Sequence, residues 1–398
     1  MENSGYVKDT LILMSDYNTK KIQDIKIGDK ILCMDNTVQN IKSIIKGDAE
    51  MYDIIPIRGN KFTVTGDQIL IFKTSNYELC WYDKTRDRYR IRWIENFNVK
   101  EKSFPISKYG SHQKAKKAAE EYLKNDIPLL QGYTKYGDII EIKATDYYSL
   151  SKKIRDIYKG YSVGINFNET PVTIDGYALG YWLGDGHTNS TAITTIDQEV
   201  KDYYKSFADQ LGLQLTQKGK YSLDITTGVN HGKTGLNPWR NFLKDNNLLG
   251  DKHIPNLYKY NSKEIRLSVL AGLIDSDGHL TNNTYDFCLK CEKLVDDTIF
   301  LARSLGFYVS GKKKVQKTCT NAKDGPKIGN YFRFHICGER LDEIPVLLKR
   351  KKAHKRESKK NACVNGIKIV PIGQNTFYGF ELEESKQILL GDFTVSKA

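Results

Sequence analysis

The sequence lacks the features of a membrane or secreted protein. It contains no run of about 18 apolar residues, the length that a membrane-spanning helix requires. The apolar segment in its first residues, MENSGYVKDTLILMSDY, is too short for a secretory signal peptide. Cysteine is scarce: the seven residues are an odd number scattered over a long chain, which favours free thiols in a reducing compartment. We therefore expect an intracellular protein, in the nucleus or the cytoplasm, that binds no membrane.

Acidic residues are too few to balance the basic ones. Lys and Arg number 61 against 48 Asp and Glu, which gives a formal net charge of +13. Such an excess favours a polyanionic partner, for which charge alone offers nucleic acid first and a membrane surface second; we expect nucleic acid and no membrane. The length of 398 residues indicates two or three domains, yet no proline-rich or low-complexity linker marks where they join.

The order of local patterns predicts a β domain that is split by a long insertion. Short apolar or alternating runs separated by turn residues lie at Leu11–Met14, Lys30–Met34, Asp53–Ile57 and Phe62–Phe72, and the last 33 residues return to this pattern. Residues 170 to 355 instead alternate helix-length and strand-like segments, an α+β pattern. We expect four parts, with boundaries at residues 1–80, 81–165, 166–362 and 363–398.

An internal repeat carries the chemistry. YALGYWLGDGH (177–187) and VLAGLIDSDGH (269–279) share an apolar run around a glycine and end in Asp-Gly-His, which matches Asp185 with Asp277. Small residues in both runs, Gly180, Gly184, Ala271 and Gly272, would let two helices approach closely, so that their C-terminal ends meet. Two carboxylates held there repel each other unless a divalent cation neutralises them, and Mg²⁺ suits such a site. The competing interpretation, two helix C-caps that end in Asp-Gly, accounts well for one copy and poorly for two.

These two motifs resemble the signature motifs of the LAGLIDADG homing endonucleases, and the second differs from the family name only at Ser276. The resemblance implies a pseudo-two-fold αββαββα core that straddles duplex DNA. It also implies that Asp185 and Asp277 hold Mg²⁺, for which Mn²⁺ can substitute, and that each site cuts one strand across the minor groove.

Basic residues near the metals also belong to the family pattern. LLGDKHIP (248–255) puts Lys252 in that place for the first half, and VLLKRKKAHK (346–355) offers Lys351 or Lys352 for the second. We assign the role to Lys352 and leave the register open. Asp275 aligns with Leu183 in the first motif, so we interpret it as a supporting residue and not as a metal ligand.

The flanking segments resemble the self-splicing Hint domain of inteins. The resemblance lies in TLILMSDYNTKKIQDIKIGDKILCMDN (10–36), FTVTGDQILIF (62–72) and FYGFELEESKQILLGDFTV (377–395). Taken together, the two resemblances cover nearly the whole chain. The chain resembles the intein-type homing endonucleases, the group that includes the intein of the yeast vacuolar ATPase and the yeast mating-type-switching endonuclease. Residues 81–165 occupy the place of an extra DNA-recognition region.

The positions that splicing requires are degenerate. The resemblance places the N-terminal nucleophile at Gly5, which has no side chain, and Gln68 stands after Thr65 where a histidine closes the second block. Gln cannot shuttle a proton near neutral pH. The final His-Asn pair is replaced by Lys397 and Ala398, and alanine has no amide that could cyclise. We expect no splicing. Either the element lost this activity naturally, or residues of an active intein were substituted to block splicing.

Two basic segments are candidates for DNA contact. KRKKAHKRESKK (349–360), with Lys349, Arg350 and Lys351, could bind phosphates or serve as a nuclear import signal. Arg86, Arg88, Arg90 and Arg92 alternate, so that in a strand they would line one face and suit the major groove. For both segments the competing interpretation is a solvated surface.

Together these features predict a monomeric, Mg²⁺-dependent endonuclease that makes double-strand cuts at a long specific site in double-stranded DNA. One alternative is a catalytically dead, sequence-specific DNA-binding relic. The other is an intein captured as a splicing-blocked mutant.

Overall fold

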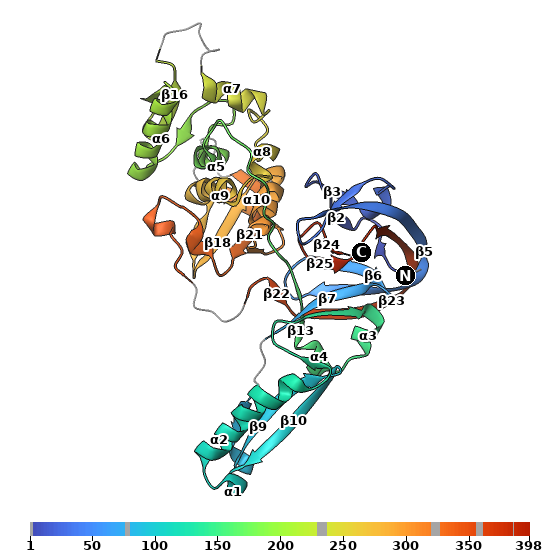
Figure 1. Cartoon of the computed structure of the whole chain (residues 1–398). Coiled ribbons are helices and arrows are strands. Elements are labelled where there is room, and N and C mark those ends of the chain that lie inside the picture. The colour runs from blue at the N-terminus through green and yellow to red at the C-terminus, as the bar shows by residue number, and fades with distance from the viewer. Residues whose placement is uncertain (1–2, 76–79, 229–236, 320–326, 356–360, 385) are drawn as a thin grey trace. The chain divides into compact units, whose positions relative to one another are not determined.

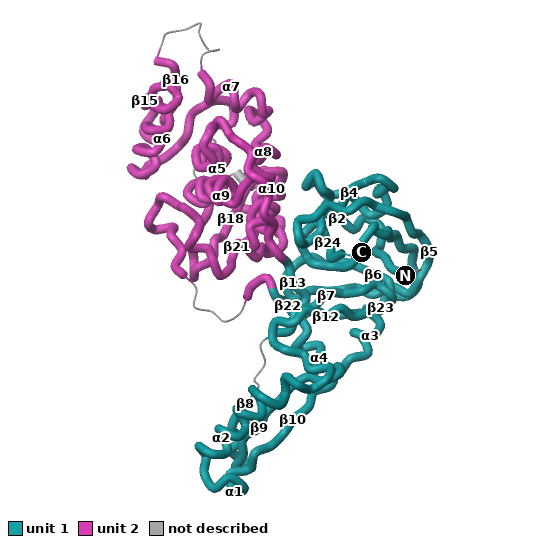
Figure 2. The backbone as a smooth tube through the Cα atoms, viewed as in Figure 1, with its two compact units in different colours: residues 1–162, 364–398 teal, residues 163–363 magenta. Residues whose placement is uncertain are grey.

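The structure, a computed structural model, describes residues 3–75, 80–228, 237–319, 327–355, 361–384 and 386–398. Two compact units make up the chain (Figure 2): unit 1 comprises residues 1–162 and 364–398, and unit 2 comprises residues 163–363. Unit 1 is therefore built from two segments that are far apart in the sequence. Within the described segments, no helix is both long enough and apolar enough to cross a membrane.

The first sheet of unit 1 is dominated by two long strands (Figure 1). β5 (Val38–Pro56) and β23 (Ile367–Leu382) pair antiparallel from Pro56↔Ile367 to Ile41↔Leu382. The strand order is β23-β1-β6-β5-β4, and the shorter members are β1 (Tyr6–Val7), β4 (Lys30–Leu32) and β6 (Phe62–Thr65). Only the last part of β5 was expected from the sequence. The expected strand at 62–72 is two strands, β6 and β7 (Ile69–Thr74), interrupted at residues 66–68.

The second sheet of unit 1 contains the strands that precede and follow unit 2 in the sequence. Its order is β22-β13-β7-β25-β24, with β12 also paired with β7. β13 pairs with β22 through Gly160↔Asn365 and Tyr161↔Val364, so the chain leaves and re-enters unit 1 on neighbouring strands. The bounds are Ile139–Lys143 for β12, Tyr158–Tyr161 for β13, Val364–Asn365 for β22, Gln387–Leu389 for β24 and Val395–Lys397 for β25.

Shorter elements complete unit 1. They are β2 (Leu11–Leu13), β3 (Thr19–Lys21), η1 (Ile22–Asp24), α3 (Ala144–Ser149) and α4 (Lys152–Arg155). Buried apolar side chains from both sheets, among them Ile31, Val64, Phe72 and Ile388, form one core.

Residues 80–134 form a separate small layer within unit 1. Its sheet consists of β8 (Cys80–Asp83), β9 (Arg88–Glu95), β10 (Asn98–Pro105) and β11 (Tyr133–Thr134). Helix α2 (His112–Glu121) starts where the Ser111 side chain accepts from the Lys114 amide, and it contributes Ala119 to a core with Ile91 and Phe104. The connecting turns are η2 (Lys84–Arg86), α1 (Ile106–Tyr109), η3 (Tyr122–Asp126) and η4 (Ile127–Leu129).

The described residues of unit 2 form two sheets, each accompanied by helices. The first part of the unit contains α5 (Gly176–Asp185), β14 (Ile193–Thr194), α6 (Gln198–Gln210), β15 (Gln214–Gln217), β16 (Ser222–Thr226), α7 (Pro238–Asp245) and α8 (Asn256–Lys259). The second part contains α9 (Lys263–Asp277), β17 (His279–Thr281), β18 (Thr284–Leu289), α10 (Glu292–Ser304), β19 (Tyr308–Val309), β20 (Lys313–Cys319), β21 (Lys327–Cys337), η6 (Leu341–Glu343) and η7 (Lys349–Lys351). The strand orders are β14-β16-β15 and β17-β18-β21-β19, and β20 pairs with β21.

Helices α5 and α9 pack closely because they present glycines to each other. A Cβ atom on Gly180 would overlap the Val269 carbonyl oxygen, and one on Gly272 would overlap backbone atoms of Tyr177 and Tyr181. Side chains fix where both helices start, since Asp175 accepts from the Tyr177 and Ala178 amides and Ser262 from the Ile265 amide. The expected close approach of the two repeated motifs is thus present.

Both ends of unit 2 are attached to one turn. The Ile165 amide donates to the Ser304 carbonyl at 2.8 Å, and the Cys363 thiol donates to the Gly306 carbonyl at 3.2 Å. Arg266, which is fully buried in α9, donates to the Ser304 hydroxyl at 2.7 Å and to the Ile165 carbonyl at 2.8 Å. The first and last residues of unit 2 are therefore near each other.

Candidate functional site

The helix pair brings the two repeated aspartates together. Asp185 is the last residue of α5 and Asp277 is the last residue of α9. A Cβ atom on Gly184 would lie 2.8 Å from the Asp277 carboxylate, so only a residue without a side chain fits between the two helix ends. The helix C-termini add partial negative charge to the two carboxylates.

The pKa values of both carboxylates show that the site disfavours their negative charges. Burial, and then the charge of Asp185, raises the pKa of Asp277 to about 6, although Lys252 and Lys351 oppose the shift. Burial also raises the pKa of Asp185, which the same two lysines and the Tyr181 hydroxyl partly offset. Part of the Asp277 side chain reaches solvent while Asp185 is half-buried, so the site opens to the surface at Asp277.

Lys252 covers the end of the first helix. Its ammonium group donates to the Trp182, Gly184 and Gly186 carbonyls at 2.9, 3.2 and 2.7 Å. Burial lowers its pKa to about 8, and the charges of Asp277 and Asp185 oppose that shift. The lysine that sequence reasoning assigned to the first half is therefore at the site.

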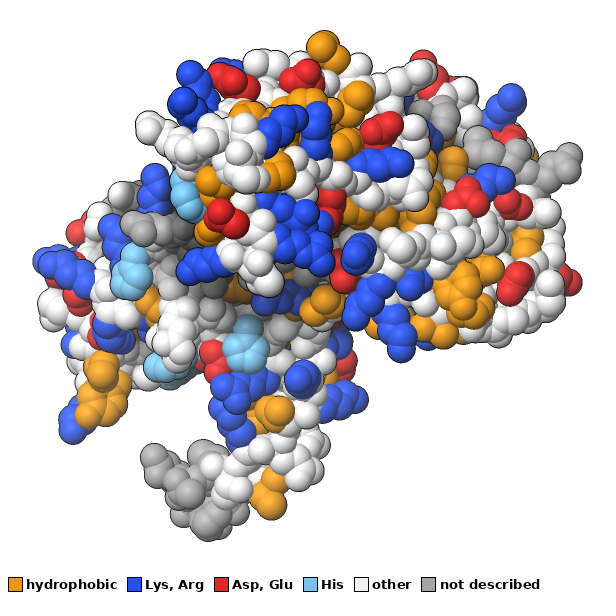
Figure 3. Space-filling model, turned by 90° about the horizontal axis from the view of Figure 1, so that it is seen from below, with side chains coloured by type: hydrophobic (Ala, Val, Ile, Leu, Met, Phe, Trp, Pro, Cys, Tyr) orange, Lys and Arg blue, Asp and Glu red, His pale blue; other side chains and the backbone are white. Residues whose placement is uncertain are grey.

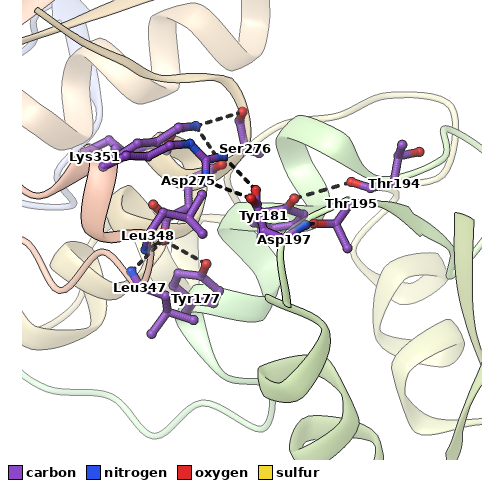
Figure 4. Close-up of polar contacts among 12 residues, drawn as sticks. Tyr177, Tyr181, Thr194, Thr195, Asp197, Asp275, Ser276, Leu347, Leu348 and Lys351 are labelled. Carbon is purple, nitrogen blue, oxygen red and sulfur yellow. Dashed lines mark hydrogen bonds and ion pairs between the residues drawn. The ribbon is translucent and has the colours of Figure 1, made fainter. Parts of the chain in front are cut away.

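Lys351 covers the end of the second helix in the same way. Its ammonium group donates to the carbonyls of Ile274, Asp275 and Ser276 at 2.8, 2.7 and 3.2 Å (Figure 4). Burial lowers its pKa, against the charges of Asp275, Asp185 and Asp277. Lys352, to which the sequence assigned this role, is exposed and follows the turn η7. Of the two lysines between which the register was left open, Lys351 is the one whose side chain η7 turns toward α9.

Asp275 is buried beside this site, with 2% of its surface exposed. One carboxylate oxygen, Oδ2, accepts from the Tyr177 hydroxyl at 2.9 Å and from the Leu347 and Leu348 amides at 2.6 and 3.3 Å (Figure 4). Burial raises the pKa of Asp275, and these three donors lower it in part. Asp275 therefore binds protein groups.

The donor set fits a divalent cation that is also held by other ligands. Within the described residues, no group of three or more His, Cys, Asp or Glu side chains is placed to hold a metal ion. Asp185 and Asp277 supply hard oxygen donors, and burial, followed by the charge of Asp185, raises the pKa of Asp277. Mg²⁺ binds through one or two carboxylates when water and phosphate oxygens complete its coordination. The two carboxylates fit that pattern.

The arginines predicted to contact DNA are only partly arranged as expected. Arg88, Arg90 and Arg92 alternate along β9, but Arg86 lies in η2, before the strand begins. Each strand arginine has an acidic partner: Arg88 pairs with Asp83 at 3.2 Å, Arg92 pairs with Glu101 at 2.7 Å, and Arg90 also pairs with Glu101. The expected row of four is thus a row of three.

The basic segment after residue 348 is likewise mixed. Lys349 is exposed, whereas the Arg350 guanidinium donates to both carboxylate oxygens of Asp197 at 2.7 Å. Lys351 belongs to the candidate site. Residues 356–360 of this segment lie outside the described residues.

The positions that the resemblance assigned to splicing lie together in unit 1. The Gly5 amide donates to the Thr65 hydroxyl at 3.1 Å, and the Ser4 hydroxyl donates to the Gln68 amide oxygen at 2.8 Å. The Gln68 amide nitrogen donates to the Lys397 carbonyl at 2.8 Å. A Cβ atom on Gly5 would lie 2.5 Å from the Tyr378 carbonyl oxygen, so the backbone leaves no room for a nucleophile there. Ala398 packs against the apolar core of this unit.

Sequence reasoning missed Tyr177, Tyr181 and Asp197, which surround the carboxylates and lysines. The Tyr181 hydroxyl donates to the Thr194 carbonyl at 3.3 Å (Figure 4). The first motif contains both tyrosines, at a spacing that puts them on one helix face, but nothing in the sequence links them to residues far along the chain.

Comparison with known proteins adds independent information. The family profile described as Hom_end-associated Hint matches residues 5–397. The homothallic switching endonuclease of Saccharomyces cerevisiae is 22% identical over 97% of this chain and 78% of that protein. The V-type proton ATPase of Candida tropicalis has a catalytic polypeptide that is 22% identical over 69% of this chain and 32% of that protein.

Among solved structures, I-DmoI in complex with DNA and Ca is 15% identical, with a TM-score of 0.26 over 40% of this chain and 81% of that chain. The family profile extends over residues 5–397, which include the helix pair α5 and α9. The chain belongs to the family of Hint domains associated with homing endonucleases.

Proposed function

We propose that this protein is a site-specific endonuclease that hydrolyses one phosphodiester in each strand of double-stranded DNA. The observation that carries the proposal is the meeting of Asp185 and Asp277 at the ends of two closely packed helices, where the pKa of Asp277 is raised to about 6. A site that forces two carboxylates together disfavours their charges, and a bound cation relieves that cost. We assign the two halves of unit 2, built around α5 and α9, to a pseudo-two-fold αββαββα core.

The residues divide the chemistry between them. Asp185 and Asp277 would hold Mg²⁺, or Mn²⁺ in its place, and the ion would stabilise charge on the phosphate and lower the pKa of a bound water. Lys252 and Lys351 keep one ammonium group at each helix end, where it balances the carboxylates and attracts the DNA phosphates. Because each lysine is held by three carbonyls, its position is fixed before DNA binds.

Charge supports DNA as the partner. The formal net charge is +13, and Lys and Arg side chains gather in clusters on the face that Figure 3 shows. We assign additional phosphate contacts to Lys349 and to the basic side chains of residues 80–134, and we expect a monomer on a long site. In the structure the described cysteines form no disulfide with one another, and we expect the protein to act inside the cell, in the nucleus or the cytoplasm.

We further propose that unit 1 is a Hint scaffold that does not splice. The close contact at Gly5 supports natural adaptation over a single substitution made to block the reaction, because the surrounding backbone has closed over the position. Mass spectrometry of the purified protein should give one intact chain.

The experiment is cleavage of a randomised double-stranded DNA library in Mg²⁺. The parent should produce cuts at one defined site, and Asp185→Asn and Asp277→Asn should each lower the rate by at least ~100-fold, the scale on which transition-state charge stabilisation acts. Asp209→Asn, an exposed aspartate on α6, is the matched control and should cut like the parent.

Two results would contradict the proposal. Equal cutting by the parent and by both site variants would place the chemistry elsewhere. Tight, sequence-selective binding without any cutting by the parent would identify a DNA-binding relic instead.

A further inference from the structure

We propose that Asp275 is a positioning residue that fixes Lys351 at the end of α9. The inference rests on the nuclease function proposed above, and it assigns a role to a buried acid that neither holds the metal nor faces solvent. It acts through the backbone of the segment that precedes η7.

The contacts of Asp275 connect two parts of unit 2 that are far apart in sequence. Its Oδ2 accepts from the amides of Leu347 and Leu348, the residues just before the turn that carries Lys351. Lys351 then reaches back to the carbonyls of Ile274, Asp275 and Ser276. The same turn of α9 therefore holds the segment through a side chain and receives the lysine through its backbone (Figure 4).

One oxygen of the Asp275 carboxylate accepts from both amides of this segment and from the Tyr177 hydroxyl. The other oxygen, Oδ1, is buried without a hydrogen-bond partner. Hydrogen bonds from backbone amides to a buried carboxylate are strong because the acceptor is charged or highly polar and water is excluded. Removing the acceptor would leave the Leu347 amide without its partner and release the segment.

The first half of unit 2 shows why only the second half needs this acid. Leu183 occupies the equivalent position in α5, and Lys252 belongs to a segment held from another element. There the Ile254 amide donates to the Asp297 carboxylate of α10 at 3.0 Å. In both halves, a carboxylate accepts from a backbone amide close in sequence to the lysine. The carboxylate belongs to α10 in the first half and to α9 in the second.

The test compares the two strands of one cleaved site. Asp275→Leu copies the residue that the first half already has, and it should slow the strand that Lys351→Met slows by about 10- to 100-fold, so that nicked DNA accumulates. Lys252→Met should slow the opposite strand. Asp275→Asn keeps an oxygen acceptor for the same donors and should restore most of the rate, whereas Tyr177→Phe should give a smaller defect on the same strand.

A second readout does not depend on cutting. Acylation of lysine amines, followed by mass spectrometry, measures how firmly each ammonium group is held. In the parent, Lys351 should react much more slowly than exposed Lys352. In Asp275→Leu, Lys351 should react about tenfold faster, while Lys252 stays protected, which also shows that the variant is folded.

The outcomes separate this inference from the proposed function. If the parent does not cut DNA, the nuclease proposal fails and acylation alone decides whether Asp275 holds Lys351. If the parent cuts but Asp275→Leu slows both strands equally, or leaves Lys351 protected, the positioning role is wrong.

Discussion

Single residues of the candidate site reduce the stability of the protein, and the clearest example is the pair of carboxylates. Asp185 and Asp277 are held together at the helix ends, and burial together with the charge of Asp185 raises the pKa of Asp277 to about 6, although Lys252 and Lys351 offset part of the shift. Such a site lowers the stability of the metal-free protein, since the charged form of each group is disfavoured in the folded state.

Asp277→Asn should therefore stabilise the metal-free protein at pH 7. Because the side chain also meets solvent, screening reduces the gain to about 1 kcal/mol of unfolding free energy. Urea unfolding in the presence of a chelator measures this gain. Addition of Mg²⁺ should then raise the melting temperature of the parent but not of the variant. A variant less stable than the parent without metal would show that the two carboxylates do not repel each other.

Gly5 is a position where close backbone packing excludes any side chain. Its prospective Cβ meets the Tyr378 carbonyl, so Gly5→Ala forces two paired strands apart and should cost about 1 to 3 kcal/mol. Gly311→Ala is the control, because nothing lies within 4 Å of its prospective Cβ. Differential scanning calorimetry of both variants distinguishes them, and a Gly5→Ala variant that melts like the parent would contradict the contact.

Elements are the scale at which the site is built, and the α5–α9 pair is the most important one. The two helices form a graded interface: a Cβ on Gly272 would overlap the backbone of α5, whereas one on Gly176 would approach the Ile265 carbonyl to 3.1 Å. The packing at Gly272 leaves no space for a side chain, whereas the packing at Gly176 allows one after a small shift of the neighbouring atoms.

Gly272→Ala should consequently destabilise unit 2 more than Gly176→Ala does, by about 2 kcal/mol. It should also abolish cutting, because the ends of the helices move apart with the carboxylates. Thermal unfolding followed by circular dichroism gives the stabilities, and the cleavage assay gives the activities. Equal effects of the two variants would mean that the helices do not approach most closely at Gly272.

The helix pair also shows what a sequence can predict and what it cannot. The repeated motifs and their small residues predicted the close approach and the meeting of Asp185 with Asp277, because both depend on local spacing within a helix. The choice between Lys351 and Lys352 depends on how η7 turns, which no local pattern determines. The role of Asp275 depends on amides 72 and 73 residues away in the chain.

Unit 1 gives a similar contrast. Alternating runs predicted a β domain, but most of β5 was not expected, since its central part alternates exposed and half-buried side chains and gains its order from pairing with β23. Arg86 was expected to extend the row of arginines on β9, yet Asp87 adopts a left-handed conformation that separates it from the strand.

At the scale of the whole molecule, Gln68 connects the first and last segments of the chain. Its amide accepts from Ser4 and donates to Lys397, and it is almost completely buried. Gln68→Ala leaves the Lys397 carbonyl and the Ser4 hydroxyl without this partner and should cost about 2 to 4 kcal/mol.

Urea unfolding of the intact protein, monitored by tyrosine and tryptophan fluorescence, measures that loss. Gln113→Ala, at an exposed position of α2, is the matched control and should be neutral. Limited proteolysis should then cleave near Lys397 in the Gln68 variant only. Resistance equal to that of the parent would show that the amide does not hold the two segments together.

The turn at Ser304–Gly306, which holds both Ile165 and Cys363, affects how the chain reaches its folded state. Before unit 2 folds, β13 and β22 are separated by a loop of about 200 residues, and closing it has an entropic cost that grows with the logarithm of its length. Once unit 2 is folded, its ends are near each other, and the same closure resembles that of a loop about a tenth as long. The entropic cost falls by about 2 kcal/mol. The insertion is therefore expected to fold first and to speed the completion of the domain that surrounds it.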